Sequence, residues 1–157
     1  MITIITPTAK LEQTKQSIEN FVSLIPDIIF EAAGKAADMV QDRVEGQGLA
    51  ANGSFLMTPS KTPIGRYGQR HGKAREKKGL STSKVDLSYT GQMWDSWKEE
   101  KGVNQTGVGF NNEEARYKAE GNEQIYDTPI FVPSEQLGER DRIRQFIKDK
   151  AKELFKI

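Results

Sequence analysis

The feature that most constrains the fold is a run of apolar side chains that recur mostly every three or four residues between Leu11 and Val44. Side chains at these intervals share one face of an α-helix, so the run predicts a long amphipathic helix. Pro26 interrupts the run, and because proline removes a backbone donor and crowds the preceding turn, we expect a kink or a second helix start there. Gly46 and Gly48 follow, as is typical of a helix C-terminus. The apolar positions are Leu11, Ile18, Phe21, Val22, Ile25, Ile28, Ile29, Ala32, Ala36, Met39 and Val40.

The second half of the chain predicts a small sheet. Lys98–Val103 and Thr106–Phe110 flank Asn104 and Gln105, which predicts a short antiparallel hairpin. Pro129–Pro133 encloses three apolar residues between prolines and is expected to form a short strand. Because proline cannot donate to a sheet, this strand belongs at an edge.

Helices are expected on both sides of that strand. Asn111–Glu120 is helical in pattern, with Asn111 or Asn112 as its N-cap. An amphipathic C-terminal helix begins near Ser134 or Glu139. The chain is therefore expected to be α+β, with helices packed against a small, mostly antiparallel sheet in one domain over residues 1–157. Val, Ile, Leu and Phe make up about 22% of the residues, just above the ~20% below which chains usually stay disordered, so the core should be thin.

The overall charge, 23 Lys and Arg against 22 Asp and Glu, conceals a basic segment. Eight cations between residues 61 and 84 are opposed by Glu76 alone. They lie within residues 46–84, a glycine-rich stretch without periodicity, which predicts an extended arm that is mobile in the free subunit and ordered by assembly. The candidate contact residues of this arm are Lys61, Arg66, Arg70, His71, Lys73, Arg75, Lys77, Lys78 and Lys84.

Cations without local acids attract phosphates or an acidic protein surface. The arm is therefore expected to face DNA or an adjacent subunit, and the sequence leaves both options open. A solvated loop without a partner is the alternative interpretation. Four apolar side chains of the arm are expected to dock on a neighbouring subunit: Phe55, Leu56, Ile64 and Tyr67.

The composition leaves few routes to catalysis. The chain has no Cys and one His, which removes thiolate sites, Cys nucleophiles and any His-based metal cluster within one chain. His71 lies in the basic, glycine-rich part, where we expect it to be exposed or to face phosphate. Asp95 with the acids and lysine of Glu99–Lys101 is similar to the metal site of some nucleases, but such spacings arise freely in a chain that is 29% charged. We expect no catalytic residues, no cofactor and no metal.

No run approaches the ~18 apolar residues that a membrane span needs, so no membrane partner is expected. Met1–Pro7 lacks the basic and apolar parts of a signal peptide, which predicts an intracellular protein.

Several short motifs carry a family resemblance. Val85–Leu87 and the Thr90–Ser96 segment TGQMWDS are followed by Gly107–Phe110, Ala115–Gly121 and Pro129–Ser134. In this order they resemble segments of tailed-phage virion morphogenesis proteins, the neck and tail-completion proteins of the head–tail junction. Thr128 stands where that family often has Arg, and the aromatic of Ala115–Gly121 is shifted, so the choice among neck, tail terminator and tail completion stays open.

The resemblance implies a non-enzymatic structural protein of the virion that forms a homo-oligomeric ring at the head–tail junction. Other neck, connector and tail proteins would be its partners, double-stranded DNA would pass through its lumen, and it would assemble in the host cytoplasm. The main alternative is a small DNA-binding or nuclease-like protein that uses the basic segment, residues 61–84.

Overall fold

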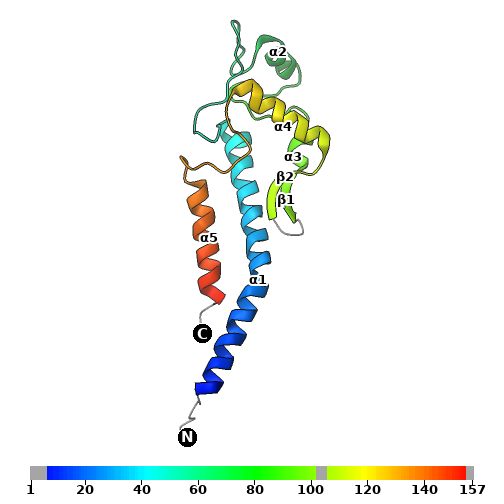
Figure 1. The fold of residues 1–157 in the computed structure, drawn as a ribbon. Helices are drawn as coiled ribbons and strands as arrows, with labels where there is room; N and C mark the ends of the chain where they lie inside the picture. The colour runs from blue at the N-terminus through cyan, green and yellow to red at the C-terminus, as the bar shows by residue number, and fades with distance from the viewer. Residues whose placement is uncertain (1–6, 102–105, 155–157) are drawn as a thin grey trace.

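The computed structural model describes residues 7–101 and 106–154 and has the predicted α+β architecture. Figure 1 shows the arrangement, in which the long helix α1 spans most of the length of the molecule. The elements are α1 (Pro7–Gln41), a π-helical segment (Asp42–Gln47), α2 (Gln69–Lys77), α3 (Gln92–Asp95), β1 (Trp97–Lys101), β2 (Thr106–Phe110), α4 (Glu113–Tyr126) and α5 (Glu139–Leu154).

The N-terminal apolar run forms one continuous helix that contains Pro26. Its axis changes direction about halfway along (Figure 1), as a proline inside a helix explains, but no second helix starts there. The π-helical segment continues α1, and Gly48 ends it with a φ of 69°. The Gly48 N–H donates to the carbonyl oxygen of Val44 at 2.8 Å, so the predicted glycine terminus is confirmed.

The second half of α1 is covered from two directions. The β1–β2 hairpin contacts it on one side and α5 runs beside it on another (Figure 1). The hairpin is antiparallel as predicted, with Trp97 opposite Phe110 and Lys101 opposite Thr106. Asn104 and Gln105, expected to connect the strands, and residues 102 and 103, expected to end the first strand, lie outside the described residues. The remaining helices gather at the end of the molecule where α1 finishes (Figure 1).

The predicted strand Pro129–Pro133 is wrong, because this segment is irregular and pairs with no strand among the described residues. Side chains satisfy its backbone instead. The N–H groups of Ile130 and Phe131 donate to Glu123 Oε1 at 2.7 and 3.1 Å. Arg43 Nη2 donates to the carbonyl oxygens of Ile130 and Val132 at 2.9 and 2.8 Å. Polar side chains therefore replace the sheet that the apolar pattern indicated.

The core is built around aromatic rings. Trp97 lies 4.8 Å from Phe110 and 5.9 Å from Phe131 between ring centres, and Trp94 packs edge-on against it at 6.4 Å. The indole N–H of Trp97 donates to the carbonyl oxygen of Ala37 in α1 at 3.1 Å. Trp94, the Trp of the TGQMWDS motif, and Trp97 thus both lie in the core, and Trp97 contacts α1 and the hairpin. Two helix starts predicted after this motif are confirmed: the Asn112 side chain caps α4, and α5 begins at Glu139.

Residues 46–84 are folded against the body, so the prediction of an extended arm is wrong. The segment includes α2 and buries Leu56 and Tyr67, each 2% exposed. Its glycines permit close packing. A Cβ on Gly65, whose φ is 58°, would lie 1.9 Å from the carbonyl oxygen of Thr82, and a Cβ on Gly72 would lie 2.6 Å from the Cβ of Ile64. Glycine content, which predicted flexibility, here marks tight contacts between backbone segments.

Candidate functional site

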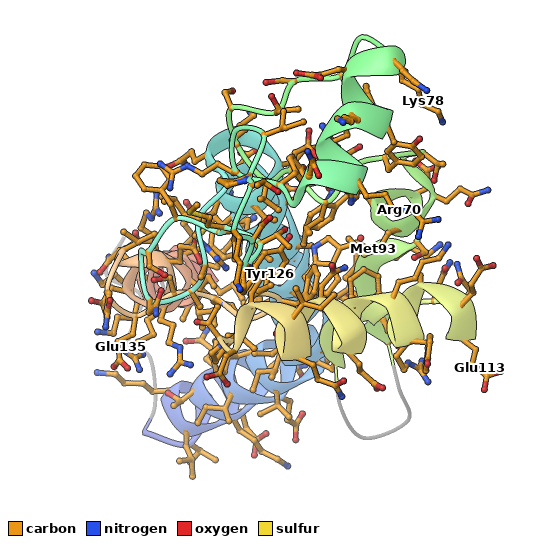
Figure 2. The ribbon with its side chains drawn as sticks, turned by 90° about the horizontal axis from the view of Figure 1, so that it is seen from above. Arg70, Lys78, Met93, Glu113, Tyr126 and Glu135 are labelled. Carbon is orange, nitrogen blue, oxygen red and sulfur yellow. The ribbon has the colours of Figure 1, made fainter. Side chains whose placement is uncertain are left out.

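Exposed cations collect on α2, at one end of the molecule. Arg70, Lys73 and Lys77 recur at intervals of three and four residues, which places them on one exposed face, and Lys78 follows at the end of the helix. Figure 2 shows Arg70 and Lys78 on this helix. None of these four side chains forms an ion pair with an acid in residues 7–101 or 106–154. We call Arg70, Lys73, Lys77 and Lys78 the basic face of α2.

Arg75, predicted to contact DNA or a neighbour, is instead 1% exposed. Its Nη2 donates to Asp86 Oδ2 at 2.6 Å, and its Nε donates to the carbonyl oxygen of Ser81 at 2.8 Å. The Tyr67 hydroxyl donates to the other oxygen of the same carboxylate at 3.0 Å. The side chain is buried because this network ties α2 to residues 81–88, so Arg75 is unavailable to any partner.

The other predicted cations belong to segments outside α2. Arg66 stacks on Phe55, with its guanidinium carbon 4.4 Å from the ring centre. Lys84 Nζ donates to the carbonyl oxygen of Gly46 at 2.5 Å, and Lys61 is exposed in the loop before α2. The fold therefore brings together about half of the cations that the sequence grouped by proximity along the chain.

The four residues predicted to dock on a neighbouring subunit also differ in their burial. Leu56 and Tyr67 belong to the core of their own chain, which corrects their assignment to a neighbour. Ile64 is half-buried beneath Gly72. Phe55 is 60% exposed and stays a candidate for contact with another subunit.

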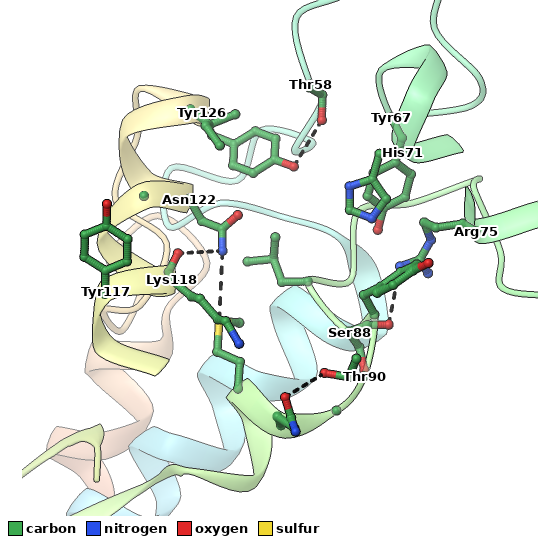
Figure 3. Close-up of a pocket in the computed structure, with 17 residues that line it drawn as sticks. Thr58, Tyr67, His71, Arg75, Ser88, Thr90, Tyr117, Lys118, Asn122 and Tyr126 are labelled. Carbon is green, nitrogen blue, oxygen red and sulfur yellow. Dashed lines mark hydrogen bonds between the residues drawn. The ribbon is translucent and has the colours of Figure 1, made fainter. Parts of the chain in front are cut away.

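A pocket of about 480 Å³ lies between α2, the Leu87–Gln92 segment and α4 (Figure 3). Its wall is mostly apolar and aromatic, with a few hydrogen-bonded polar groups, as is common in binding pockets. The Tyr126 hydroxyl lies 3.2 Å from Thr58 Oγ1 across it. Tyr117 and Ile125 are exposed near its edge, at 77% and 53%. This pocket was not predicted from the sequence, although the four-residue spacing of Tyr117, Gly121 and Ile125 marks one face of α4.

His71 forms part of the pocket wall; the residue is exposed, as predicted, while its ring contacts two tyrosines. Its ring centre lies 4.9 Å from that of Tyr67 and 5.3 Å from that of Tyr89. Burial lowers the pKa of His71, the Arg75 guanidinium lowers it further, and Asp86 acts in the opposite direction. Burial likewise raises the pKa of Tyr67 above its usual range. The imidazole is therefore neutral at pH 7 and contributes no charge to the basic face of α2.

We expect this lowered pKa to make folding sensitive to acid. The unfolded chain, with a His pKa of about 6.5, binds the proton more readily than the folded chain, so stability falls as the pH decreases through about 6.5. Thermal unfolding between about pH 7.5 and 5.5 should show a smaller loss of Tm in His71→Gln than in the wild type. Equal losses in the two proteins would contradict a neutral, packed His71.

No three His, Asp or Glu side chains in the described part of the chain converge as a metal site would require. Lys101 of the nuclease-like set pairs with Asp27 at 3.4 Å. A search of the same residues for a helix that is sufficiently long and apolar to span a bilayer found none. Comparison of the chain with family models, with curated proteins and with solved structures found no match.

Proposed function

We propose that this chain is the subunit of a non-enzymatic, homo-oligomeric ring at the head–tail junction of a tailed phage, and that DNA passes along the basic face of α2. The observation that carries the proposal is that face itself. Three cations project from this helix of nine residues and Lys78 follows directly at its C-cap, whereas the fourth cation of the helix, Arg75, is buried in an ion pair. Unpaired cations on a rigid element are suited to sequence-independent contact with phosphates.

The family resemblance supports the same function. The TGQMWDS motif supplies Met93 and Trp94 to the core, and its first residues, Thr90, Gly91 and Gln92, border the pocket beside α2. A structural role for this motif is expected in a virion protein, where the residues that the family shares maintain the fold. The neck, tail-terminator and tail-completion positions are all compatible with this proposal, as are neighbouring connector and tail proteins as partners.

DNA binding tests the role assigned to α2. We expect the triple variant Arg70→Ala/Lys73→Ala/Lys77→Ala to bind a double-stranded oligonucleotide at least about tenfold more weakly, and to reduce the log–log salt slope by ~2–3, at about 0.9 per phosphate contact. Fluorescence anisotropy across a salt series measures both quantities. The matched control is Lys98→Ala/Arg142→Ala/Lys152→Ala, which removes the same charge from β1 and α5.

Equal slopes in the two triple variants would contradict a DNA contact on α2. Electron microscopy of the wild-type protein separately tests the ring. A strict monomer that binds one DNA sequence selectively, or that cleaves DNA in a metal-dependent manner, would favour the alternative, a small DNA-binding or nuclease-like protein.

A further inference from the structure

The first half of α1 carries an apolar stripe that no part of the described chain covers. No side chain between residues 8 and 27 is buried. The stripe consists of Leu11, Ile18, Val22, Ile25 and Ile29, whose exposed fractions are 67%, 51%, 56%, 39% and 36%. Their spacing of seven, four, three and four residues places them on one side of the helix. An exposed stripe of large aliphatic residues on a projecting helix indicates a missing partner.

The stripe continues a face that is buried farther along the same helix. Ala32 and Ala36 follow Ile25 and Ile29 at the seven-residue spacing and are 4% and 7% exposed. Two ion pairs lie near the far ends of the covering elements. Lys101 of the hairpin pairs with Asp27 at 3.4 Å, and Lys150 of α5, which continues to Leu154, pairs with Glu31 at 2.9 Å. Past these pairs, toward its N-terminus, α1 projects beyond the other helices and strands of the described residues, as Figure 1 shows. Residues 8–27, which carry most of the stripe, form a stretch of helix about 30 Å long at ~1.5 Å per residue.

The same chain also presents an open apolar groove. It has a volume of about 370 Å³ and lies along α1 between the hairpin and α5. Ile29, the last residue of the stripe, and the alanines at positions 32, 33 and 36 line its α1 side, and Val108 of β2 and Ile147 of α5 line it from the other elements. Val132, at the edge of the groove, is 39% exposed. Small residues on the floor leave room for the large side chains of another helix.

We propose that the groove receives residues 8–27 of α1 from a second copy of this chain. Each copy has one uncovered stripe and one open groove, and because α1 is continuous through Gln41, its first half cannot turn back into the groove of its own chain. The two surfaces also carry opposite charges. Glu12 and Glu19 each follow a stripe residue and share one flank of the helix, where Glu19 also pairs with Lys15 at 4.0 Å. The exposed Arg144 and Lys148 each follow a groove residue of α5, and Arg144 also pairs with Asp141 at 2.9 Å.

The contact is heterologous, since the stripe of one copy meets the groove of the next. Such contacts close into a ring when the rotation between copies allows it. This inference rests on the proposed ring and adds the surfaces that build it.

Two double variants of the full chain test the stripe and the groove separately. The stripe variant Ile18→Glu/Val22→Glu changes exposed positions of α1, and the groove variant Thr106→Glu/Val132→Glu changes the edge of the groove. We expect each to weaken self-association at least about 100-fold, because a carboxylate would be buried without a partner. Gln16→Glu/Ser23→Glu, on the other side of the same helix, adds equal charge and should assemble like the wild type. Sedimentation velocity measures assembly, and circular dichroism checks that each variant is folded.

Mixing the two variants gives the sharpest result. The groove variant still has an intact stripe and the stripe variant an intact groove, so the mixture should form a one-to-one dimer although each variant alone is a monomer. Assembly of the groove variant alone would show that stripes pair with each other and would overturn the proposal. Rings in all variants would overturn it while leaving the proposed ring function in place, whereas a monomeric wild type would contradict both.

Discussion

Replacing Arg43 by alanine is expected to lower the free energy of unfolding by about 3–5 kcal/mol, the range observed when one partner of a buried ion pair is removed. Arg43 is 1% exposed, and its Nε donates to Glu139 Oε1 at 3.0 Å. Its remaining donors contact the carbonyl oxygens of Leu49, Ile130 and Val132 at 2.8–2.9 Å. The substitution would therefore leave a buried carboxylate and several buried carbonyl groups without their donor.

Urea unfolding at a fixed protein concentration measures this loss. The control is Arg142→Ala, an exposed arginine in the first turns of α5, for which we expect a change within about 0.5 kcal/mol. If the free energy of unfolding changes as little in Arg43→Ala as in the control, the guanidinium does not stabilise this part of the fold. In that case it does not attach the start of α5, and the irregular segment before α5, to the end of α1. A large loss would identify Arg43 as the side chain that joins these distant segments.

Arg75→Ala is expected to have a comparable effect on stability, about 3–5 kcal/mol, for the same physical reason. The side chain joins α2 to the carboxylate of Asp86, which also accepts a hydrogen bond from Tyr67. Its loss should release α2, so trypsin should cleave the variant after the cations of this helix faster than it cleaves the wild type.

Arg70→Ala is the matched control, because it removes the same charge from the exposed face of the same helix. It should leave stability within about 0.5 kcal/mol of the wild type and weaken DNA binding instead. Arg75→Ala with unchanged stability but weaker DNA binding would contradict the buried ion pair and restore Arg75 to the predicted contact surface.

Features that depend on local spacing were predictable from sequence. The apolar intervals after Leu11 predicted α1, Gly48 marked its end, and Asn112 marked the start of α4. The hairpin around residues 102–105 was also predicted, because each strand is short and its partner adjacent in the chain. Helix faces, caps and tight hairpins involve residues within a few positions of each other, so their signals survive in one sequence without tertiary information.

Pro129–Pro133 was misassigned to a strand because side chains, and not a neighbouring strand, form its backbone hydrogen bonds. An apolar run between prolines resembles an edge strand, but Glu123 and Arg43 occupy its backbone groups in this fold. Side chains that satisfy an irregular backbone leave no periodic pattern in the sequence.

By itself, the sequence determined that α1 is amphipathic, that the cations between residues 61 and 84 lack nearby acids, and that the class is α+β. Only the tertiary structure decided which of these side chains meet a partner. Asp86 buries Arg75, and Thr82 and Ile64 approach Gly65 and Gly72 too closely for a side chain, so a segment expected to be loose is packed. The apolar face of α1 is buried at Ala36 and exposed at Ile18, because α5 and the hairpin contact only the second half of the helix. Helical spacing defines a face, whereas burial requires a second element at the same place, and the position of that element is a property of the whole fold.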